Sequence, residues 1–554
     1  FPNRSGWAPG TLMDLWSINP VTGEFDDVGD MRVSADGMTI ETISGGVRNS
    51  SWHFPCPRLG SGTNATPDPR CDNCPAGEAL TSIVELQTGA ILEEHRLVSY
   101  SSLGAARGIT LTYDSERASP RAFVSANFDV ELIFINPPAQ TSGITLLATR
   151  LSVVTGGVET QIPGYLGGED DLPLGSRFVS LNDLRFEDSG RAITTTVPVD
   201  LTNAPTGVFD FALTASVHRS QGVFTSGTSS TVRGQIVSVN SIDSFFGAGW
   251  GIAGLQRIVP TNSGGILLVD DDGTELAFGA PLTPASRYVN PPGHFGTLVR
   301  LGDGSYRHTT PDQTILRFSQ DGLLSSVVDR NHNTTEYMYD QNGRLLKIVD
   351  PVGLETTITY AGGRATAITD PAQRVTTLEY DSAGNLVSIT DPDSSRRRWS
   401  YDSNHRMIAE QDQLDRRETE TYDEFGAAIS GQRKDGTFVQ TRNTMSASAR
   451  ASTSLDADEQ LPNTHFRDDA ALFSDGRGQV ARYTLDQAGQ MTALLDAAGT
   501  QGTVVRNASN LVTQTTNGRG DISTYEYDAM GNVTAMHDQF VTLAGEAVSH
   551  FPAQ

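Results

Sequence analysis

Short stretches in which apolar and polar residues alternate follow one another through the second half of the chain. In Thr376–Tyr380 the apolar residues Leu378 and Tyr380 are two positions apart, and alternate residues of a strand face the same side of a sheet. The same pairing recurs in Tyr337 with Tyr339, Ile358 with Tyr360 and Trp399 with Tyr401. The pattern predicts short β-strands that present one apolar face.

Turn signals separate these strand-like stretches. Aliphatic and β-branched stretches such as Leu345–Val349 and Leu386–Thr390 favour strands and end at an Asp-Pro pair, where proline cannot donate to a ladder. Each preceding turn has a glycine, which tolerates the backbone angles of a chain reversal, at Gly343, Gly363, Gly384 or Gly426. One hairpin per period is therefore expected.

The period of these hairpins is 20 or 21 residues. The tyrosines that mark it are Tyr339, Tyr360, Tyr380, Tyr401 and Tyr422, with spacings of 21, 20, 21 and 21 residues. All but Tyr360 are followed by aspartate, at Asp340, Asp381, Asp402 and Asp423, and a second marker runs in phase at Asp350, Asp370 and Asp391. Two markers that share one period predict an array of hairpins that pair edge to edge.

The array is expected to continue to the end of the chain. An irregular stretch of small and polar residues interrupts it near 443–470. Tyr483 and Asp486 then imitate the earlier spacing, and Tyr527 with Asp528 restores it.

Composition and charge exclude several classes of protein. The chain has 554 residues, 37% of them hydrophobic, and 55 glycines, which is typical of a turn-rich globular protein. Its 66 acidic and 40 basic residues give a net charge of −26, so nucleic acid is not expected as a partner. No apolar run approaches the ~20 residues of a membrane-spanning helix.

No pattern of catalytic residues stands out, and the repeat aspartates are expected to bond turn backbone. The chain has no G-x-S-x-G, phosphate-loop, dinucleotide or H-E-x-x-H motif, so we predict no enzyme, no catalytic residue and no cofactor. The acidic runs Asp270–Gly273 and Gly168–Asp171 could attract a hard cation, but a hairpin turn and a solvated loop are the favoured interpretations.

The cysteines leave three alternatives open. His53, Cys56, Cys71 and Cys74 have a spacing that can present four ligands to tetrahedral zinc. A disulfide between Cys56 and either other cysteine would leave one thiol free, and all three could also stay unlinked. The disulfide is the favoured interpretation, so no metal is assigned.

The repeat resembles the YD repeat of bacterial Rhs proteins, insecticidal toxin complexes and teneurins. Gly343–Gly353 and Gly384–Pro392 are similar to whole units of that family. Phe246–Leu255 resembles the segment that begins the repeat region in many members, and Tyr100–Asp114 a block found before it. The resemblance covers about residues 90–120 and 243–554.

The resemblance implies an all-β fold in which a spiralling β-ribbon of hairpins forms a hollow shell after β-sandwich-like domains. Alternating stretches at Phe128–Phe134 and Phe209–Leu213 favour a sandwich, and family analogy suggests that it plugs the shell. The expected divisions are a small β-domain at 1–55, a cysteine-containing linker at 56–87, pre-repeat strands at 88–125, the sandwich at 126–242, the start of the shell at 243–328 and YD repeats at 329–554.

The expected function is a non-enzymatic scaffold that encloses a C-terminal cargo or toxin domain. We treat the chain as part of a longer bacterial polypeptide, secreted or at the cell surface, whose cargo lies beyond Gln554. The alternative is a teneurin-like adhesion protein that binds a surface receptor or glycan, with Trp7, Trp16 and Trp52 as natural contacts.

Overall fold

The computed structural model divides the chain into two compact units, Phe1–Leu80 and Thr81–Gln554, and each is described by itself. The residues that it describes are 9, 12–18, 25–35, 40–45, 53–57, 82–129, 144–155, 158–161, 176–180, 192–221, 224–283, 287–451, 470–486, 489–541 and 547–550.

The first unit contains a four-stranded antiparallel sheet. Its strands are β1 (Leu12–Ile18), β2 (Phe25–Val33), β3 (Ile40–Gly45) and β4 (His53–Pro57), in the order β3-β2-β1-β4. β2 and β3 pair antiparallel, from Gly29 with Gly45 to Val33 with Ile40. The backbones of His53 and Cys56 belong to β4, whereas Cys71 and Cys74 lie outside the described residues, so the zinc and disulfide alternatives stay predictions.

The second unit begins with a sheet that joins two distant parts of the sequence. Its strands are β5 (Ser82–Val84), β6 (Ile91–Arg96), β9 (Thr110–Asp114) and β17 (Trp250–Ile252), in the order β17-β9-β6-β5. A small hairpin of β7 (Tyr100–Ser102) and β8 (Ala105–Arg107) lies between β6 and β9 in the sequence. The helix α1 (Ser115–Ala118) follows β9, and its cap Asp114 accepts bonds from the backbone N–H groups of Glu116 and Arg117.

Two further sheets occupy the region predicted as a sandwich. One pairs β10 (Arg121–Asp129) with β14 (Ala192–Asp200). The other contains β11 (Ile144–Thr155), β12 (Val158–Gln161), β13 (Ser176–Ser180), β15 (Gly207–Gln221) and β16 (Phe224–Ser238). Of the stretch expected at Phe128–Phe134, only Phe128 and Asp129 are described. The sandwich, its plug role and the other domain boundaries remain predictions.

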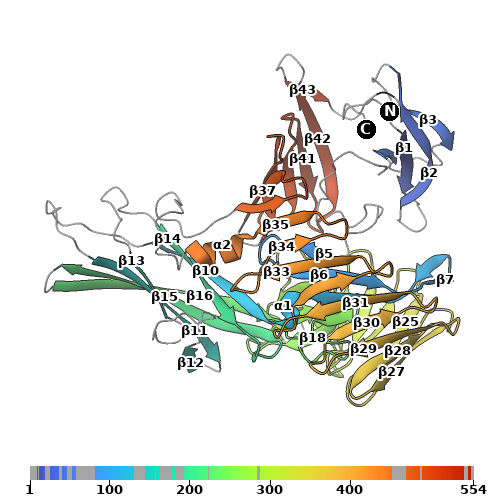
Figure 1. The fold of residues 1–554 in the computed structure, drawn as a ribbon, viewed down its shortest axis with the longest axis horizontal. Helices are drawn as coiled ribbons and strands as arrows, with labels where there is room; N and C mark the ends of the chain where they lie inside the picture. The colour runs from blue at the N-terminus through green and yellow to red at the C-terminus, as the bar shows by residue number, and fades with distance from the viewer. Residues whose placement is uncertain are drawn as a thin grey trace. The chain divides into compact units, whose positions relative to one another are not determined.

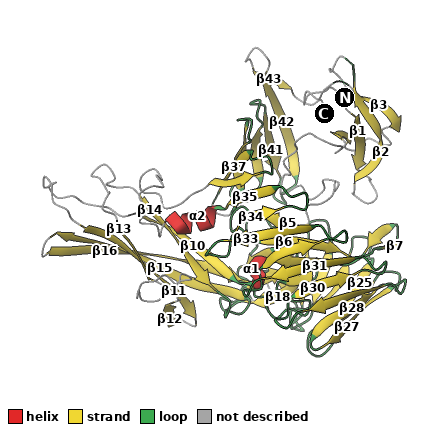
Figure 2. Ribbon diagram, in the orientation of Figure 1, coloured by secondary structure: helices red, strands yellow, loops and turns green. Residues whose placement is uncertain are grey.

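A long antiparallel ribbon forms most of the second unit (Figures 1 and 2). A three-stranded sheet of β18 (Arg257–Pro260), β19 (Ile266–Val269) and β20 (Glu275–Phe278) precedes it. The ribbon then joins 23 strands in chain order. They are β21 (Thr297–Arg300), β22 (Tyr306–Thr309), β23 (Ile315–Phe318), β24 (Leu324–Val328), β25 (Thr334–Tyr339), β26 (Leu345–Val349), β27 (Glu355–Ala361), β28 (Arg364–Thr369), β29 (Val375–Tyr380), β30 (Leu386–Thr390), β31 (Arg396–Tyr401), β32 (Met407–Gln411), β33 (Arg417–Tyr422), β34 (Ala428–Gln432), β35 (Phe438–Arg442), β36 (Ala470–Ser474), β37 (Val480–Leu485), β38 (Met491–Leu495), β39 (Gln501–Arg506), β40 (Val512–Thr516), β41 (Ile522–Tyr527), β42 (Val533–Val541) and β43 (Ala547–His550).

The all-β class and the consecutive hairpins over residues 329–430 are confirmed, because every strand from β25 to β34 pairs antiparallel with its neighbour in sequence. Where the repeat was expected to be interrupted, near 443–470, the helix α2 (Thr444–Ala451) lies between β35 and β36. Asn443 starts this helix by accepting a bond from the Ser446 N–H at 2.9 Å. Neither described helix has the length needed to cross a membrane.

One face of the ribbon packs on the sheet of β5, β6, β9 and β17. Its buried core joins ribbon residues to two segments from earlier in the chain, at Leu97–Ala118 and Phe246–Ile252. The ribbon residues are Leu345, Ile358, Ala365, Ile368, Leu378, Leu386, Ile389, Trp399 and Met407. This face is called the inner face below.

Candidate functional site

Five of the repeat tyrosines lie in the same environment, and Tyr339 shares with them the bulge that precedes it. Just before the tyrosine the strand register shifts by a β-bulge, as at Glu379/Tyr380 and Ser400/Tyr401. The hydroxyl then donates to the backbone carbonyl of the residue 15 positions earlier, at 2.5 to 2.7 Å. These pairs are Tyr360 with Leu345, Tyr380 with Ala365, Tyr401 with Leu386, Tyr422 with Met407 and Tyr527 with Val512.

An arginine makes the same bond in one later repeat. Arg506 follows the same bulge, and its Nη1 donates to the Met491 carbonyl, again 15 residues earlier, at 2.7 Å. In the preceding repeat the residue after the bulge is Leu485, whereas Tyr483 lies two positions before it. The position assigned to Tyr483 from spacing therefore belongs to Leu485.

The repeat aspartates bond the turns that follow them. In each turn one carboxylate oxygen accepts from the backbone N–H groups two and four residues later, at 2.8 to 3.0 Å. This holds for Asp340, Asp350, Asp370, Asp381, Asp402, Asp423 and Asp528. The bond from the Arg344 side chain lowers the pKa of Asp340, so this carboxylate is charged at neutral pH.

Two repeats depart from this turn. Tyr360 is followed by a tight reversal in which Gly362 and Gly363 both have positive φ, as two-residue hairpin loops require. Asp391 keeps the backbone bonds of its turn, but its Oδ2 lies 3.6 Å from Nε2 of the buried His95. The N–H of Ser395 instead donates to Asp393.

Arginines stack on the repeat tyrosines. Arg344 lies over the Tyr360 ring, Arg364 over Tyr380 and Arg406 over Tyr422, at 4.9 to 5.7 Å from the ring centroid. Burial raises the pKa of each tyrosine, so the hydroxyls stay protonated donors. Hydroxyl, bulge and stacked arginine together join each repeat to the one before it.

The two covering segments make polar as well as apolar contacts with the inner face. The hydroxyl of the buried Tyr113 donates to the His405 carbonyl at 2.8 Å and accepts from the Met407 N–H at 2.9 Å. Trp250 Nε1 donates to the Tyr401 hydroxyl at 2.8 Å, and its ring packs on Trp399 with centroids 5.0 Å apart. Residues more than 150 positions apart thus complete one core.

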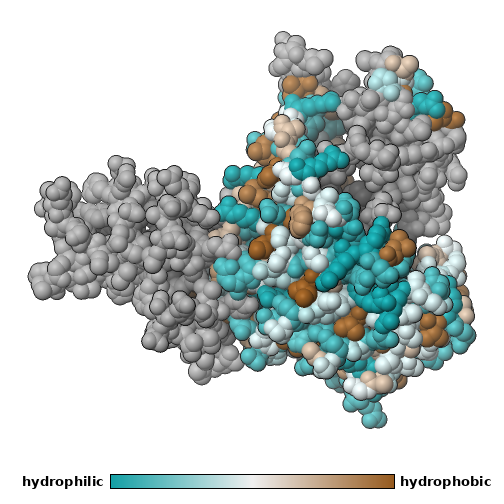
Figure 3. Space-filling model, viewed as in Figure 1, coloured by the Kyte–Doolittle hydropathy of each residue, from teal (hydrophilic) through white to brown (hydrophobic). Residues whose placement is uncertain are grey.

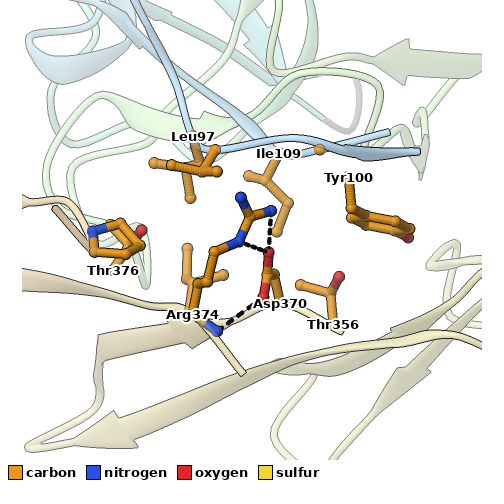
Figure 4. Close-up of a pocket in the computed structure, with 11 residues that line it drawn as sticks. Leu97, Tyr100, Ile109, Thr356, Asp370, Arg374 and Thr376 are labelled. Carbon is orange, nitrogen blue, oxygen red and sulfur yellow. Dashed lines mark hydrogen bonds and ion pairs between the residues drawn. The ribbon is translucent and has the colours of Figure 1, made fainter. Parts of the chain in front are cut away.

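A small pocket opens where the covering segment meets the repeat turns (Figure 4). Leu97 and Ile109 line one side, and Asp370 and Arg374 lie opposite. Arg374 Nε donates to Asp370 Oδ2 at 2.7 Å, and its guanidinium also donates to the Ser99 carbonyl. The pocket's charged groups are therefore already paired.

Further along the ribbon the inner face becomes charged. The position that holds Ile368 and Ile389 in earlier repeats holds Glu410, which is ion-paired with Lys434 at 2.8 Å and Arg397 at 3.3 Å. In the next hairpin, burial raises the pKa of Glu420 to about 8, and the nearby Glu418 adds to the rise. This group, called the charged belt below, comprises Arg397, Glu410, Glu418, Glu420 and Lys434.

Beyond Leu485 the same inner positions are no longer buried among the described residues. After Leu485, none of the described residues up to Val541 is buried. The inner-face pairs there are Val504 with Thr515 and Tyr525 with Met536, whereas the corresponding pair Leu378 with Ile389 is 4% and 0% exposed. In the view of Figure 3, the surface of the described residues is mostly hydrophilic with scattered apolar side chains.

The acidic run at Asp270 forms a hairpin turn between β19 and β20. Asp270 accepts bonds from the Gly254 N–H and the Gln256 side chain, and Arg117 donates to its backbone carbonyl at 2.6 Å. Asp271 accepts from the Ile252 N–H. Within the described ranges no group of three or more His, Cys, Asp or Glu side chains is arranged to hold a metal ion, and Gly168–Asp171 lies outside them.

Comparison with protein families identifies the repeat. The RHS repeat model matches residues 318–356, 360–396, 380–416 and 506–538. These stretches are RHS repeats. Each match begins at the residue that follows the bulge, namely Phe318, Tyr360, Tyr380 or Arg506, so the RHS repeat of this chain coincides with its structural unit.

The curated relatives are much longer than this chain. A tRNA nuclease WapA from Bacillus subtilis strain 168 is 32% identical over 109 residues, which cover 20% of this chain and 4% of that protein. The tRNA(Glu)-specific nuclease WapA of Bacillus subtilis subsp. natto gives the same values.

The solved structures to which this chain is similar include a TcdB2-TccC3-TEV crystal structure, which is 12% identical and covers 62% of this chain and 22% of that one, with a TM-score of 0.28. The Tc holotoxin pore of Photorhabdus luminescens is 12% identical over 66% of this chain and 21% of that one, with a TM-score of 0.25. These scores are low, so the identification depends on the repeat match.

Proposed function

We propose that the RHS-repeat ribbon is the wall of a shell that encloses a polypeptide carried by the same protein. The observation that carries this proposal is the inner face beyond Leu485, where none of the described residues up to Val541 is buried. Equivalent positions are closed by the chain's own segments around Leu386 and are only half-buried around Val504. A second polypeptide surface can cover the half-buried positions without rebuilding the ribbon.

The wall itself contributes no catalysis in this proposal. The repeat aspartates are engaged by turn N–H groups and the tyrosine hydroxyls by carbonyls, which leaves these groups in structural roles. The relative named a tRNA nuclease shares only a short part of its length with this chain. Its activity is therefore not transferred to the repeats. The enclosed polypeptide is the cargo or toxin expected from the sequence, and a secreted or surface location in bacteria belongs to the same proposal.

Expression of residues 1–554 inside bacterial cells tests the absence of catalysis. We expect normal growth and intact tRNA, and purified chain should leave added tRNA uncleaved. Cleavage that co-purifies with the chain through successive columns would overturn the proposal.

Limited proteolysis of the protein purified together with its cargo tests enclosure. We expect the cargo to resist a protease that digests it when it is free. Replacement of Val504 and Met536 by aspartate should make the cargo sensitive while the ribbon is cut at its normal rate. Equal protection in both proteins would count against enclosure by this face. The adhesion alternative depends on Trp7, Trp16 and Trp52, whose side chains lie outside the described part of the chain.

A further inference from the structure

Two histidines meet at the start of the ribbon, away from the inner face. His294 lies in the loop between β20 and β21, and His308 lies on β22. Their Nε2 atoms are 2.9 Å apart, and the rings are tilted by 34° with centroids 5.0 Å apart. His308 is buried, whereas His294 is half-buried.

The surroundings hold both rings in place. The Phe278 ring packs edge-on against His294 and His308, with centroids 5.1 and 6.1 Å away. The Asn290 side-chain amide donates to the carbonyls of His294 and Gly296, at 2.9 and 2.8 Å, and so ties the loop to itself. The rings are therefore positioned before any ligand arrives.

Gly296 leaves room beside both ring nitrogens. A β-carbon at this residue would lie 2.7 Å from Nε2 of His294, 2.7 Å from Nε2 of His308 and 2.9 Å from the Thr309 carbonyl oxygen. Three electron-pair donors thus converge next to a residue without a side chain. Any larger residue at Gly296 would push the two rings apart.

Both imidazoles are in the form that binds metals. Burial lowers the pKa of His294, and it lowers that of His308 to about 4, with a smaller contribution from the neighbouring His294. Neutral imidazole is a ligand for zinc, copper and nickel, whereas calcium and magnesium prefer oxygen. Because the loop ring is half-exposed, water can complete the coordination.

We propose that His294 and His308 form a binding site for a divalent transition-metal ion, with the Thr309 carbonyl as a candidate third donor. On binding, the proton that one Nε2 now donates to the other moves to Nδ1 of the same ring, so that both Nε2 lone pairs face the ion. It joins the loop to β22.

The loop that carries His294 also lies against turns of the late ribbon, so an ion bound there would affect that contact. A β-carbon on Gly531 would lie 2.7 Å from the Phe295 ring, and one on Gly293 would lie 3.3 Å from Asn510. These contacts place the loop against turns that come more than 200 residues later. An ion that fixes His294 therefore also steadies the contact between the first and the late repeats.

Titration with zinc at pH 7.5 tests the proposal. Replacement of Cys56, Cys71 and Cys74 by serine removes the three cysteine ligands of the other candidate zinc site. We expect one equivalent to bind to this background by calorimetry, and cobalt to give a visible spectrum without a thiolate band. His294→Gln and His308→Gln should each weaken binding at least tenfold.

His332→Gln is the matched control, because His332 is exposed in a turn and takes no part in the pair. It should bind zinc as the background does. Thermal unfolding of each variant without metal shows whether it is folded, and the loop variant His294→Gln should melt within a few degrees of the background. Absence of binding in the folded background, or unchanged binding in His294→Gln, would overturn the proposal.

Discussion

The hairpins of residues 345–411 and those of residues 491–541 follow one repeat but differ in what covers them. Both have a bulge, a turn capped by Asp or Asn and a hydroxyl or guanidinium bonded 15 residues back. Only the first region buries its inner face, with Leu386 at 0% exposed, whereas Val533 at the same position is 56% exposed. Local repeat bonds therefore build the ribbon, and distant segments decide where it gains a core.

The largest effect that separates the two regions should come from deleting side chains at that shared position. Leu386→Ala leaves a cavity against the covering segments and should lower the free energy of unfolding by about 2–5 kcal/mol. Val533→Ala should change it by less than about 0.5 kcal/mol because the side chain already contacts water. Urea unfolding measures both. Equal losses would mean that the late ribbon is covered in solution.

The charged belt marks the boundary between the regions and gives a pH dependence. The pKa of Glu420 is about 8 when folded and near 4.5 when unfolded, so the folded state binds more protons between these values. Stability should therefore fall as the pH rises from about 5 to 8.

Glu420→Gln should reduce the dependence of stability on pH. At pH 8 it should be more stable than the parent by about 1–2 kcal/mol, a value reduced because solvent screens the half-buried carboxylate. Glu526→Gln, at an exposed ribbon position, is the control and should keep the parent's slope. Urea midpoints at pH 5, 6.5 and 8 provide the measurement. A parent whose stability rises over this range would contradict the assignment.

Removal of a single hydroxyl should distinguish the regions less strongly than removal of the Leu386 side chain. Tyr401→Phe leaves both the Trp250 N–H and the Leu386 carbonyl without their partner in a buried site, and should cost about 1–3 kcal/mol. Tyr527→Phe removes one bond near solvent and should cost about 0.5 kcal/mol. Thermal unfolding of the pair, with hydrogen exchange of the Leu386 and Val512 strands, checks this order.

The smallest effect should come from exchanging the two donors of the repeat. Arg506→Tyr keeps a donor to the Met491 carbonyl, so stability should change by less than about 0.5 kcal/mol. Arg506→Met removes the donor and should destabilise the late hairpins more than the tyrosine variant does. Faster exchange of the β38 and β39 amides in the methionine variant alone is the expected readout.

Period and turn chemistry predicted the ribbon well because both depend on nearby residues. The tyrosine spacing and the Asp-x-x-Gly turns are local, and the turn bonds of Asp381 and Asp402 follow from them. Leu485 lies 21 residues before Arg506, but the neighbouring Tyr483 was predicted as the repeat position because it is a tyrosine. The bond of Arg506 was not predicted, because an arginine takes the place of the tyrosine there and the prediction followed tyrosines.

The covering of the inner face could not be read from the repeat. Tyr113 and Trp250 reach His405 and Tyr401 across 292 and 151 positions, and no periodic signal connects them. The pairing of Asp391 with His95 was missed for the same reason, since its spacing made it an ordinary turn residue. The two histidines His294 and His308 are separated by 14 residues of non-repeating sequence.

The bond that spans 15 residues requires the ribbon to contain a whole number of repeat units. Each tyrosine donor finds its acceptor in the preceding unit, so a whole unit of 20 or 21 residues can be added or removed and every donor still has an acceptor. A gain or loss of one residue within a strand would break that pairing and reverse the alternation of the strand. One bulge per unit bends the strand in the same sense each time, so each added hairpin also adds a similar bend to the ribbon.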